Sequence, residues 1–273
     1  MILFPNCKIN LGLNIVEKRP DGYHNIETVM VPVPWCDILE IVPSADGVLK
    51  LFTSGNAVDC PMEKNLVVKA YRAVAEQYDI PPVHIYLHKI IPDGAGLGGG
   101  SSDAASMIMG LNRLFSLGMT DDRMAAIAGT IGADCPFFIY NRPMLATGIG
   151  TEFGDIDLAL ENLWIVVVKP DVSVPTKEAY AGVTPRLPQH NLRESLSEPM
   201  ANWSGKVKND FEPGIFALHP VVGEIKQAML DGGAIYSAMS GSGSAVFGLF
   251  NSEPEATAVK ALFEKNHSFM GKL

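Results

Sequence analysis

The chain has 273 residues, of which 47% are hydrophobic and 19% charged, and this composition is typical of a globular protein with ample material for a core. Its formal net charge of −9 argues against nucleic-acid binding, because an acidic surface repels a phosphate backbone. The N-terminal residues MILFPNCKIN lack the features of a secretion signal, and no apolar run approaches the roughly 20 residues that span a membrane.

The four cysteines indicate a reducing compartment. Cys7, Cys36, Cys60 and Cys135 are widely scattered, form no CxxC pair and lack the spacing of a metal site. We therefore expect reduced thiols in a cytoplasmic protein.

The first half of the chain alternates apolar and polar residues in the manner of strands, and a helix follows. The turn DGYH at Asp21–His24 separates the first two strands, and apolar residues of helical spacing predict a helix over Lys64–Tyr78. The predicted strands are Phe4–Leu13, Asn25–Pro34, Asp37–Val42, Val48–Thr53 and Val83–Ile91.

The rest of the chain predicts a second group of strands and helices. Thr120 is expected to cap a helix over Met124–Ile131. Strands are predicted at Leu163–Val168, Ile235–Met239 and Ala245–Phe250, and helices at Thr176–Ala181, Pro220–Leu230 and Glu253–Glu264. This order is compatible with part of a ferredoxin-like α+β sandwich. A composition change predicts one domain over residues 1–152 and another over residues 153–273.

A glycine-rich stretch, PDGAGLGGGSSDAA at Pro92–Ala105, follows the predicted strand Val83–Ile91 and precedes residues of helical spacing. Ser101–Asp103 are the N-cap candidates of that helix. Glycine backbone can approach an anion closely, and the first N–H groups of a helix lack intrahelical partners at the positive end of its dipole. We therefore predict a phosphate-binding loop.

Two common nucleotide-binding folds fit this loop poorly. Gly94, Gly96 and Gly99 match GxGxxG, but the region Leu114–Arg123, where a dinucleotide-binding fold needs an acidic residue after a second strand, is a helix end and a turn. The sequence also lacks the GxxxxGK[ST] pattern of a P-loop.

Three motifs read together resemble those of the GHMP kinase superfamily. They are PNCKINL at Pro5–Leu11, the glycine-rich stretch at Pro92–Ala105 and MSGSGSAVFG at Met239–Gly248. Within that superfamily, DGYH, GLGGGSSDAA and GADCPFF are similar to the motifs of members that phosphorylate 4-diphosphocytidyl-2-C-methyl-D-erythritol. One departure is Asn6-Cys7, where the family more often has a small residue before the lysine.

The resemblance implies a two-domain α+β kinase, with an N-terminal domain like ribosomal protein S5 domain 2 and a ferredoxin-like C-terminal domain. Such a kinase transfers phosphate from ATP to a hydroxyl of that substrate, giving the 2-phosphate and ADP. It places this step in the non-mevalonate route to isoprenoid precursors and implies a monomer or weak homodimer that binds a small molecule with a cytidine diphosphate moiety. Mg²⁺ is expected with ATP, and Ser102 is the candidate protein ligand.

The resemblance also assigns residues. Asp134 is the candidate base and Lys8 the group that keeps it ionised and helps to place the hydroxyl. The ATP side comprises Asn65, Pro92, Asp93, Gly94, Ala95, Gly96, Leu97, Gly98, Gly99, Gly100, Ser101 and Ser102. The substrate side comprises Asn10, Tyr23, His24, Thr176, Gly241 and Ser242.

Each residue alone has an ordinary structural explanation. Asp134 alone is a turn or cap residue, Lys8 a solvated strand residue and Asn65 a helix N-cap. Two functional alternatives also remain: a kinase of the same superfamily acting on mevalonate, homoserine or a sugar, and a non-catalytic nucleotide sensor. DGYH argues against the former, and the presence of both Lys8 and Asp134 against the latter.

Overall fold

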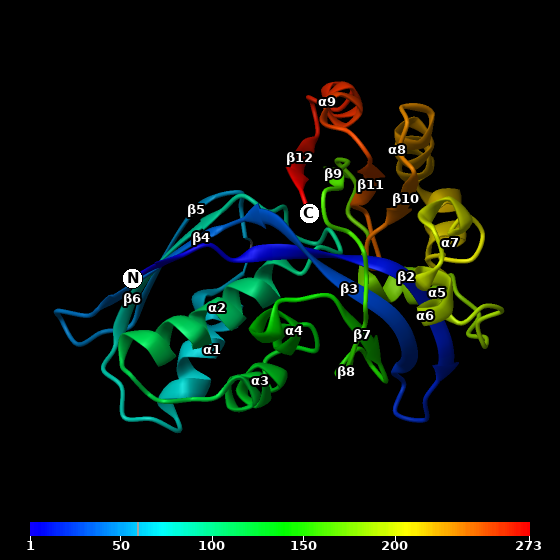
Figure 1. The fold of residues 1–273 in the computed structure, drawn as a ribbon. Helices are drawn as coiled ribbons and strands as arrows, with labels where there is room; N and C mark the ends of the chain where they lie inside the picture. Colours follow the sequence, from blue (N-terminus) through cyan, green and yellow to red (C-terminus); the bar gives the residue numbers. More distant parts are fainter. Residues whose placement is uncertain (59) are drawn as a thin grey trace. The chain divides into compact units, whose positions relative to one another are not determined.

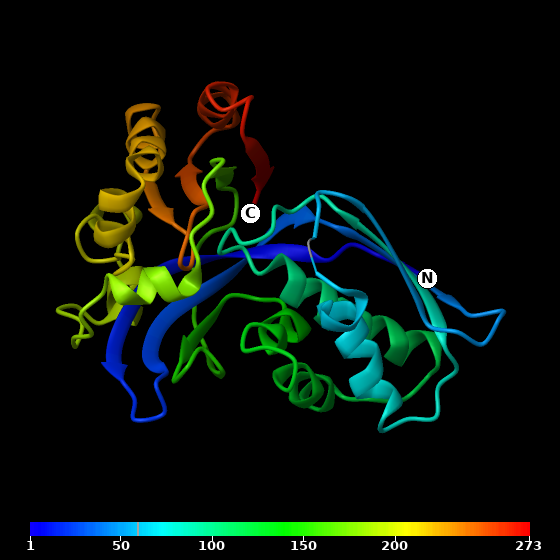
Figure 2. The ribbon, with the colours of Figure 1, turned by 180° about the vertical axis from the view of Figure 1, so that it is seen from behind.

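The computed structural model describes residues 1–58 and 60–273, which are shown from two opposite sides in Figures 1 and 2. The chain divides into two compact units that interleave along the sequence. Unit 1 comprises Met1–Cys7, Trp35–Asp93 and Gly98–Arg142, and unit 2 comprises Lys8–Pro34, Gly94–Leu97 and Pro143–Leu273. The boundary predicted at residue 152 stays a prediction, since these units are defined by contacts and not by chain order.

Unit 1 is a sheet with helices on one of its faces (Figure 1). The strand order is β1 (Ile2–Leu3), β4 (Ile38–Pro43), β6 (Val83–Lys89) and β5 (Lys50–Gly55), and only the β5–β6 pair in this order is parallel. The helical elements are η1 (Met62–Lys64), α1 (Leu66–Ala75), α2 (Gly99–Leu114), α3 (Asp121–Gly129) and α4 (Cys135–Tyr140).

Helix α2 packs closely on this sheet at Gly110. A Cβ atom at Gly110 would lie 2.5 Å from Ile41 Cδ1 and 2.7 Å from Leu3 Cδ1, so a larger residue would push the helix away from strands β4 and β1. The position of α2 matters because its first residues belong to the glycine-rich stretch.

Unit 2 contains two more sheets. Strand β2 (Asn6–Lys18) pairs with β3 (His24–Cys36), followed by β7 (Met144–Thr147) and β8 (Glu152–Asp155); the outermost residues 6–7 and 35–36 belong to unit 1. The other sheet is antiparallel, in the order β10 (Tyr236–Met239), β11 (Val246–Phe250), β9 (Trp164–Lys169) and β12 (His267–Lys272).

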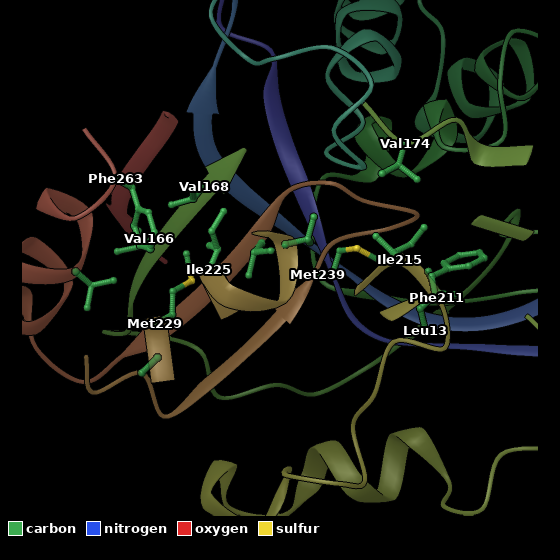
Figure 3. Close-up of a cluster of buried hydrophobic side chains, with 14 of the residues drawn as sticks. Leu13, Val166, Val168, Val174, Phe211, Ile215, Ile225, Met229, Met239 and Phe263 are labelled. Atoms are coloured by element: carbon green, nitrogen blue, oxygen red, sulfur yellow. The ribbon is translucent and has the colours of Figure 1, made fainter. Parts of the chain in front are cut away.

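The helical elements of unit 2 are α5 (Thr176–Ala181), α6 (Leu192–Ser197), η2 (Met200–Asn202), α7 (Glu212–Leu218), α8 (Pro220–Asp231) and α9 (Glu253–Ala261). A buried apolar cluster joins α8 and α9 to the β9–β11 region, as Figure 3 shows. Val166 and Val168 of β9 lie in it with Ile225 and Met229 of α8. This cluster fixes the ends of β10 and β11, which carry the second glycine-serine loop between them.

Most predicted elements are confirmed. Helix α5 has the predicted bounds, and Thr120 caps α3 by accepting a hydrogen bond from Arg123 N. The elements of unit 2 that were not predicted include α7 and β12. Among residues 1–58 and 60–273, the structure has no helix with the length and apolarity that crossing a membrane requires.

Candidate active site

The glycine-rich stretch forms a loop followed by the start of α2. Gly94, Gly96 and Gly98 all have positive φ (59°, 74° and 69°), a region that side chains with a Cβ rarely adopt. The predicted N-cap is wrong: Gly98 is the N-cap, α2 begins at Gly99, and Ser101–Asp103 lie inside the helix. Because the helix starts earlier than predicted, the N–H groups that precede its first intrahelical bond, from Ser102 N to Gly98 O, are those of Gly99, Gly100 and Ser101, and such groups can bind a phosphate.

The middle of this loop lies against the second glycine-serine loop, Ser240–Ser244, within unit 2. Ser240 Oγ donates a hydrogen bond of 2.9 Å to Gly96 O, and Ala245 N donates one of 3.1 Å to Ala95 O. A Cβ atom at Gly96 would lie 2.1 Å from Ser240 O, and one at Gly241 would lie 3.1 Å from Gly96 Cα. Glycine is therefore required at Gly96 both by its φ and by this close approach.

Lys8 on β2 lies beneath the same loop. Its ammonium donates hydrogen bonds of 3.0 Å to Gly96 O and 2.7 Å to Asn10 Oδ1. Asn10 in turn donates to Thr28 Oγ1, and Thr28 donates to Gly12 O. Lys8 is only 4% exposed and Asn10 only 2%. These two hydrogen bonds place the ammonium of a buried lysine against the glycine-rich loop.

Asp134 occupies the N-cap position of α4 in unit 1 and is half-buried. Its neighbour Cys135 is fully buried, and α4 packs against the phosphate-loop helix α2. Burial raises the pKa of Cys135 to about 11, and the Asp134 charge adds to the effect, so the thiol is protonated at neutral pH. Asp134 therefore lies at the start of a short helix that packs on α2 within unit 1.

The DGYH turn is held by an ion pair at its base. The Arg19 guanidinium lies 3.0 Å from Asp21 Oδ2 and donates a hydrogen bond to it. Two hydrogen bonds from backbone N–H groups complete the turn: Tyr23 N donates to Asp21 Oδ1, and Arg19 N donates to Tyr23 O. The hydrogen bond from Arg19, together with that from Tyr23 N, lowers the pKa of Asp21 below its usual value. The turn presents the Tyr23 ring to solvent, 63% exposed, and starts β3 at His24.

His24 stacks on an aromatic ring that the sequence did not single out. The imidazole and the ring of Tyr180, on α5, have centroids 4.6 Å apart and planes inclined by 22°. The Phe211 ring contacts Tyr180 in an edge-to-face arrangement, with ring centroids 4.9 Å apart. Thr176 is the first residue of α5 and is exposed, one turn before Tyr180. The signal that could have identified Tyr180 is this spacing, since one helical turn puts both residues on the same side of α5.

A cavity of about 170 Å³ in unit 1 lies beside the start of α2. Asn65 caps α1 by accepting a hydrogen bond of 3.1 Å from Val67 N and lines the cavity. Leu66 and Leu87 supply apolar walls, and Lys89 and Asp103 supply charge. A cavity with apolar walls and a few polar groups suits an aromatic base.

Lys89 connects two buried carboxylates beneath this cavity. Its ammonium pairs with Asp37 and, at 2.7 Å, with Asp103 Oδ2. Asp103 Oδ1 has no hydrogen-bond partner within the described part of the chain. Burial, aided by the charge of Asp37, raises the pKa of Asp103 to about 7 even though Lys89 opposes the shift. When both Asp37 and Asp103 are ionised, the single positive charge of Lys89 offsets only one of their two negative charges.

The predicted site residues are divided between the two units. Lys8, Asn10, Tyr23, His24, residues 94–97, Thr176, Gly241 and Ser242 belong to unit 2. Asn65, Pro92, Asp93, residues 98–102 and Asp134 belong to unit 1. The structure brings Lys8, Asn10, Gly96 and Gly241 together, whereas the pairing of Lys8 with Asp134 stays a prediction because the two lie in different units.

Comparison with known proteins gives matches over the whole chain. The models of the GHMP kinases N terminal domain and the GHMP kinases C terminal domain match residues 65–142 and 189–267. The 4-diphosphocytidyl-2-C-methyl-D-erythritol kinases of Parabacteroides distasonis and Bacteroides fragilis are 52% and 50% identical, over 100% of this chain and of each relative. The crystal structure of a 4-(cytidine 5'-diphospho)-2C-methyl-D-erythritol kinase has a TM-score of 0.83 at 32% identity, covering 99% of this chain and 98% of that one.

Proposed function

The chain belongs to the GHMP kinase family, and we propose that it transfers the γ-phosphoryl group of ATP to a hydroxyl of 4-diphosphocytidyl-2-C-methyl-D-erythritol, giving the 2-phosphate and ADP. The two-domain α+β fold predicted for that family and its class, a small-molecule kinase that uses ATP, are confirmed. The observation that carries the proposal is the Lys8 ammonium bonded to Gly96, at the point where the two glycine loops meet.

The phosphates of ATP are assigned to the first glycine loop. Its positive-φ glycines have a backbone conformation that allows N–H groups to face an anion, and the start of α2 adds N–H groups that precede its first intrahelical bond and the positive end of its dipole. The nucleoside is assigned to the neighbouring cavity, where Asn65 lies between apolar walls. Pro92 and Asp93 lead from that cavity into the loop.

The acceptor hydroxyl is assigned to Lys8 and Asp134. In the transfer step the hydroxyl oxygen forms a bond to the γ-phosphorus, the bond from phosphorus to the bridging oxygen breaks, and ADP leaves. The hydroxyl proton passes to the Asp134 carboxylate, which lies at the N-cap position of α4. Lys8 offsets negative charge that accumulates on the transferring group, and Asn10 holds the ammonium in place.

The cytidine diphosphate moiety is assigned to the other residues of unit 2. Tyr23 and His24 offer an aromatic face and a hydrogen-bonding ring, and Tyr180 adds a second face that is already stacked on His24. Thr176, on the same helix as Tyr180, is also assigned to the cytidine side. Gly241 and Ser242, on the second glycine loop, are assigned to the diphosphate.

Mg²⁺ is part of the proposal, and the residues present fit a cation that depends mainly on the nucleotide. Among residues 1–58 and 60–273, no three His, Cys, Asp or Glu side chains gather as a metal site. Such a cation would take phosphate oxygens and water as most of its ligands, which is usual for Mg²⁺ in kinases. Ser102, in the first turn of α2, is the candidate protein ligand, and the ion would neutralise charge on the phosphates.

The setting of the reaction is proposed on chemical grounds. None of the four cysteines, Cys7, Cys36, Cys60 and Cys135, forms a disulfide bond in the structure, and the reducing cytoplasm is the compartment in which thiols persist. The reaction would serve the non-mevalonate route to isoprenoid precursors. We propose a monomer or weak homodimer, which sedimentation at several protein concentrations would test.

The test is an assay of ADP release with Mg-ATP and a panel of acceptors. The panel contains 4-diphosphocytidyl-2-C-methyl-D-erythritol, mevalonate, homoserine and galactose. We expect turnover with the cytidine compound alone. Turnover with another acceptor would keep the kinase class and overturn the roles of Tyr23 and His24, and ATP binding without any turnover would favour the sensor.

A further inference from the structure

A short buried segment of unit 2, Asn209–Glu212, lies between strand β2 and the second glycine loop. On the β2 side, Leu13 N donates to Lys208 O at 2.7 Å and Asp210 N donates to Leu13 O at 2.8 Å. The Asp210 carboxylate accepts a hydrogen bond of 2.8 Å from Ile15 N. The segment is thereby attached to the strand that carries Lys8 and Asn10.

On the other side, Asn209 binds the second glycine loop with its amide. Nδ2 donates to Met239 O and to Gly241 O, both at 2.8 Å, and Oδ1 accepts from Phe211 N at 3.0 Å. The bond from Phe211 N fixes which end of the amide faces the loop, and Asn209 is only 2% exposed. Two carbonyl oxygens require two donors, which an amide supplies from a single nitrogen and a carboxylate cannot supply.

Glu212 holds the residue just before the loop. Its Oε1 accepts a hydrogen bond of 2.9 Å from Met239 N, and its Oε2 pairs with Lys226 at 2.6 Å. Met239 is therefore fixed at its N–H by Glu212 and at its carbonyl by Asn209. Gly241 is held at its carbonyl, which accepts a hydrogen bond from the same Asn209 nitrogen.

The place of Gly241 matters because the two glycine loops touch there. Gly241 has φ +56°, and a Cβ atom built on it would be 3.1 Å from Gly96 Cα and 3.5 Å from Asn10 Oδ1. A displacement of Gly241 by an ångström would thus disturb Gly96 and the Lys8–Asn10 pair, all within unit 2. Small errors in the position of binding groups reduce transfer rates strongly.

We propose that Asn209 is a positioning residue for phosphoryl transfer, and that it acts by holding the Gly241 carbonyl so that the second glycine loop stays in register with Gly96 and Lys8. This inference rests on the proposed function, in which Gly241 and Ser242 contact the substrate diphosphate. Asn209 does not touch substrate; it acts through the loop.

The test compares the full-length protein with its Asn209→Asp and Asn209→Ala variants. Asn209→Asp preserves side-chain volume but removes both donors, and Asn209→Ala serves if a buried carboxylate prevents folding. We expect kcat/KM for 4-diphosphocytidyl-2-C-methyl-D-erythritol to fall by about 30-fold, the equivalent of two ordinary hydrogen bonds, while KM for ATP changes by less than about threefold. The control is Asn251→Asp, at an exposed asparagine of the same unit, which should retain wild-type values.

A second measurement does not depend on the identity of the substrate. Hydrogen exchange followed by mass spectrometry should show faster exchange of the amides of residues 239–245 in the Asn209 variants, with the rest of unit 2 unchanged. Wild-type kcat/KM in Asn209→Ala would overturn the proposal, as would an equal loss of ATP affinity and of turnover with faster exchange throughout the unit. If the wild type does not phosphorylate the cytidine compound, the proposed function fails, and faster exchange confined to the loop still supports the clamp while unchanged exchange overturns it.

Discussion

The buried cluster Asp37–Lys89–Asp103 predicts an unusual dependence of stability on pH. The pKa of Asp103 is raised by burial from an ordinary value of 3.8 to about 7. Between these values the folded protein holds a proton that the unfolded chain has released. The free energy of unfolding therefore falls as the pH rises through this range, which is the opposite of the usual contribution from a carboxylate.

The magnitude follows from the two pKa values. Between about pH 5.5 and about pH 8.5, deprotonation of Asp103 should lower the free energy of unfolding by about 2 kcal/mol. Asp103→Asn has the shape of the protonated acid and does not titrate. The difference in unfolding free energy between the wild type and Asp103→Asn should therefore fall by about 2 kcal/mol across that interval.

Urea unfolding at several pH values in this interval measures the difference directly. The control is Asp79→Asn, which removes one carboxylate from an exposed position of the same unit and should give a constant difference from the wild type. A constant difference for Asp103→Asn as well would refute the reasoning. It would mean that attraction to Lys89 outweighs burial and the charge of Asp37, and that Asp103 is ionised throughout.

Four further predictions concern the cluster and the site. Lys89→Met leaves two buried carboxylates without their cation and should lower the free energy of unfolding by about 3–5 kcal/mol, measured by urea unfolding; a loss below about 1 kcal/mol would contradict the buried pair. Asp134→Asn should reduce kcat by about 10²–10⁴-fold in the ADP-release assay without loss of stability, and unchanged turnover would exclude Asp134 as the base. Tyr180→Ala should raise KM for the cytidine substrate by about tenfold, and an equal rise in KM for ATP would argue against a role at the base. Gly96→Ala should abolish measurable turnover, because its Cβ would lie 2.1 Å from Ser240 O; activity within about threefold of the wild type would show that the loops separate without consequence.

The local elements could be predicted because their signals are local. Thr120 caps α3 as predicted, since a threonine before two acidic residues satisfies the first N–H groups of a helix by itself. The N-cap of α2 was predicted wrongly for the same reason. Serine is a better cap than glycine on local preference, but the left-handed conformation of Gly98 sets the start of the helix two residues before the first serine.

The elements that were missed are stabilised mainly by distant contacts. The α7 sequence, Glu212–Leu218, contains Pro213 and Gly214, which obscure helical spacing, and its first residue is fixed by Met239 and Lys226. Strand β12 reads HSFMGK, with little alternation, and it forms because six of its residues pair with β9. The spacing of residues in the sequence does not reveal the contacts of Glu212 with Met239 and Lys226, or the pairing of β12 with β9.

The same distinction separates the two parts of the candidate site. The phosphate loop needs several glycines in one stretch of chain, so composition alone predicts it. The pairing of His24 with Tyr180 and the clamp of Asn209 on Gly241 each join segments far apart in the sequence, and an asparagine or a tyrosine in isolation has many ordinary uses. Chemistry that depends on one conformation of the backbone is therefore visible in the sequence, whereas chemistry that depends on the placement of a side chain by another element becomes visible only in the fold. Asn209 tests this view, because its importance is argued from hydrogen bonds to two carbonyl groups and from no motif that contains it.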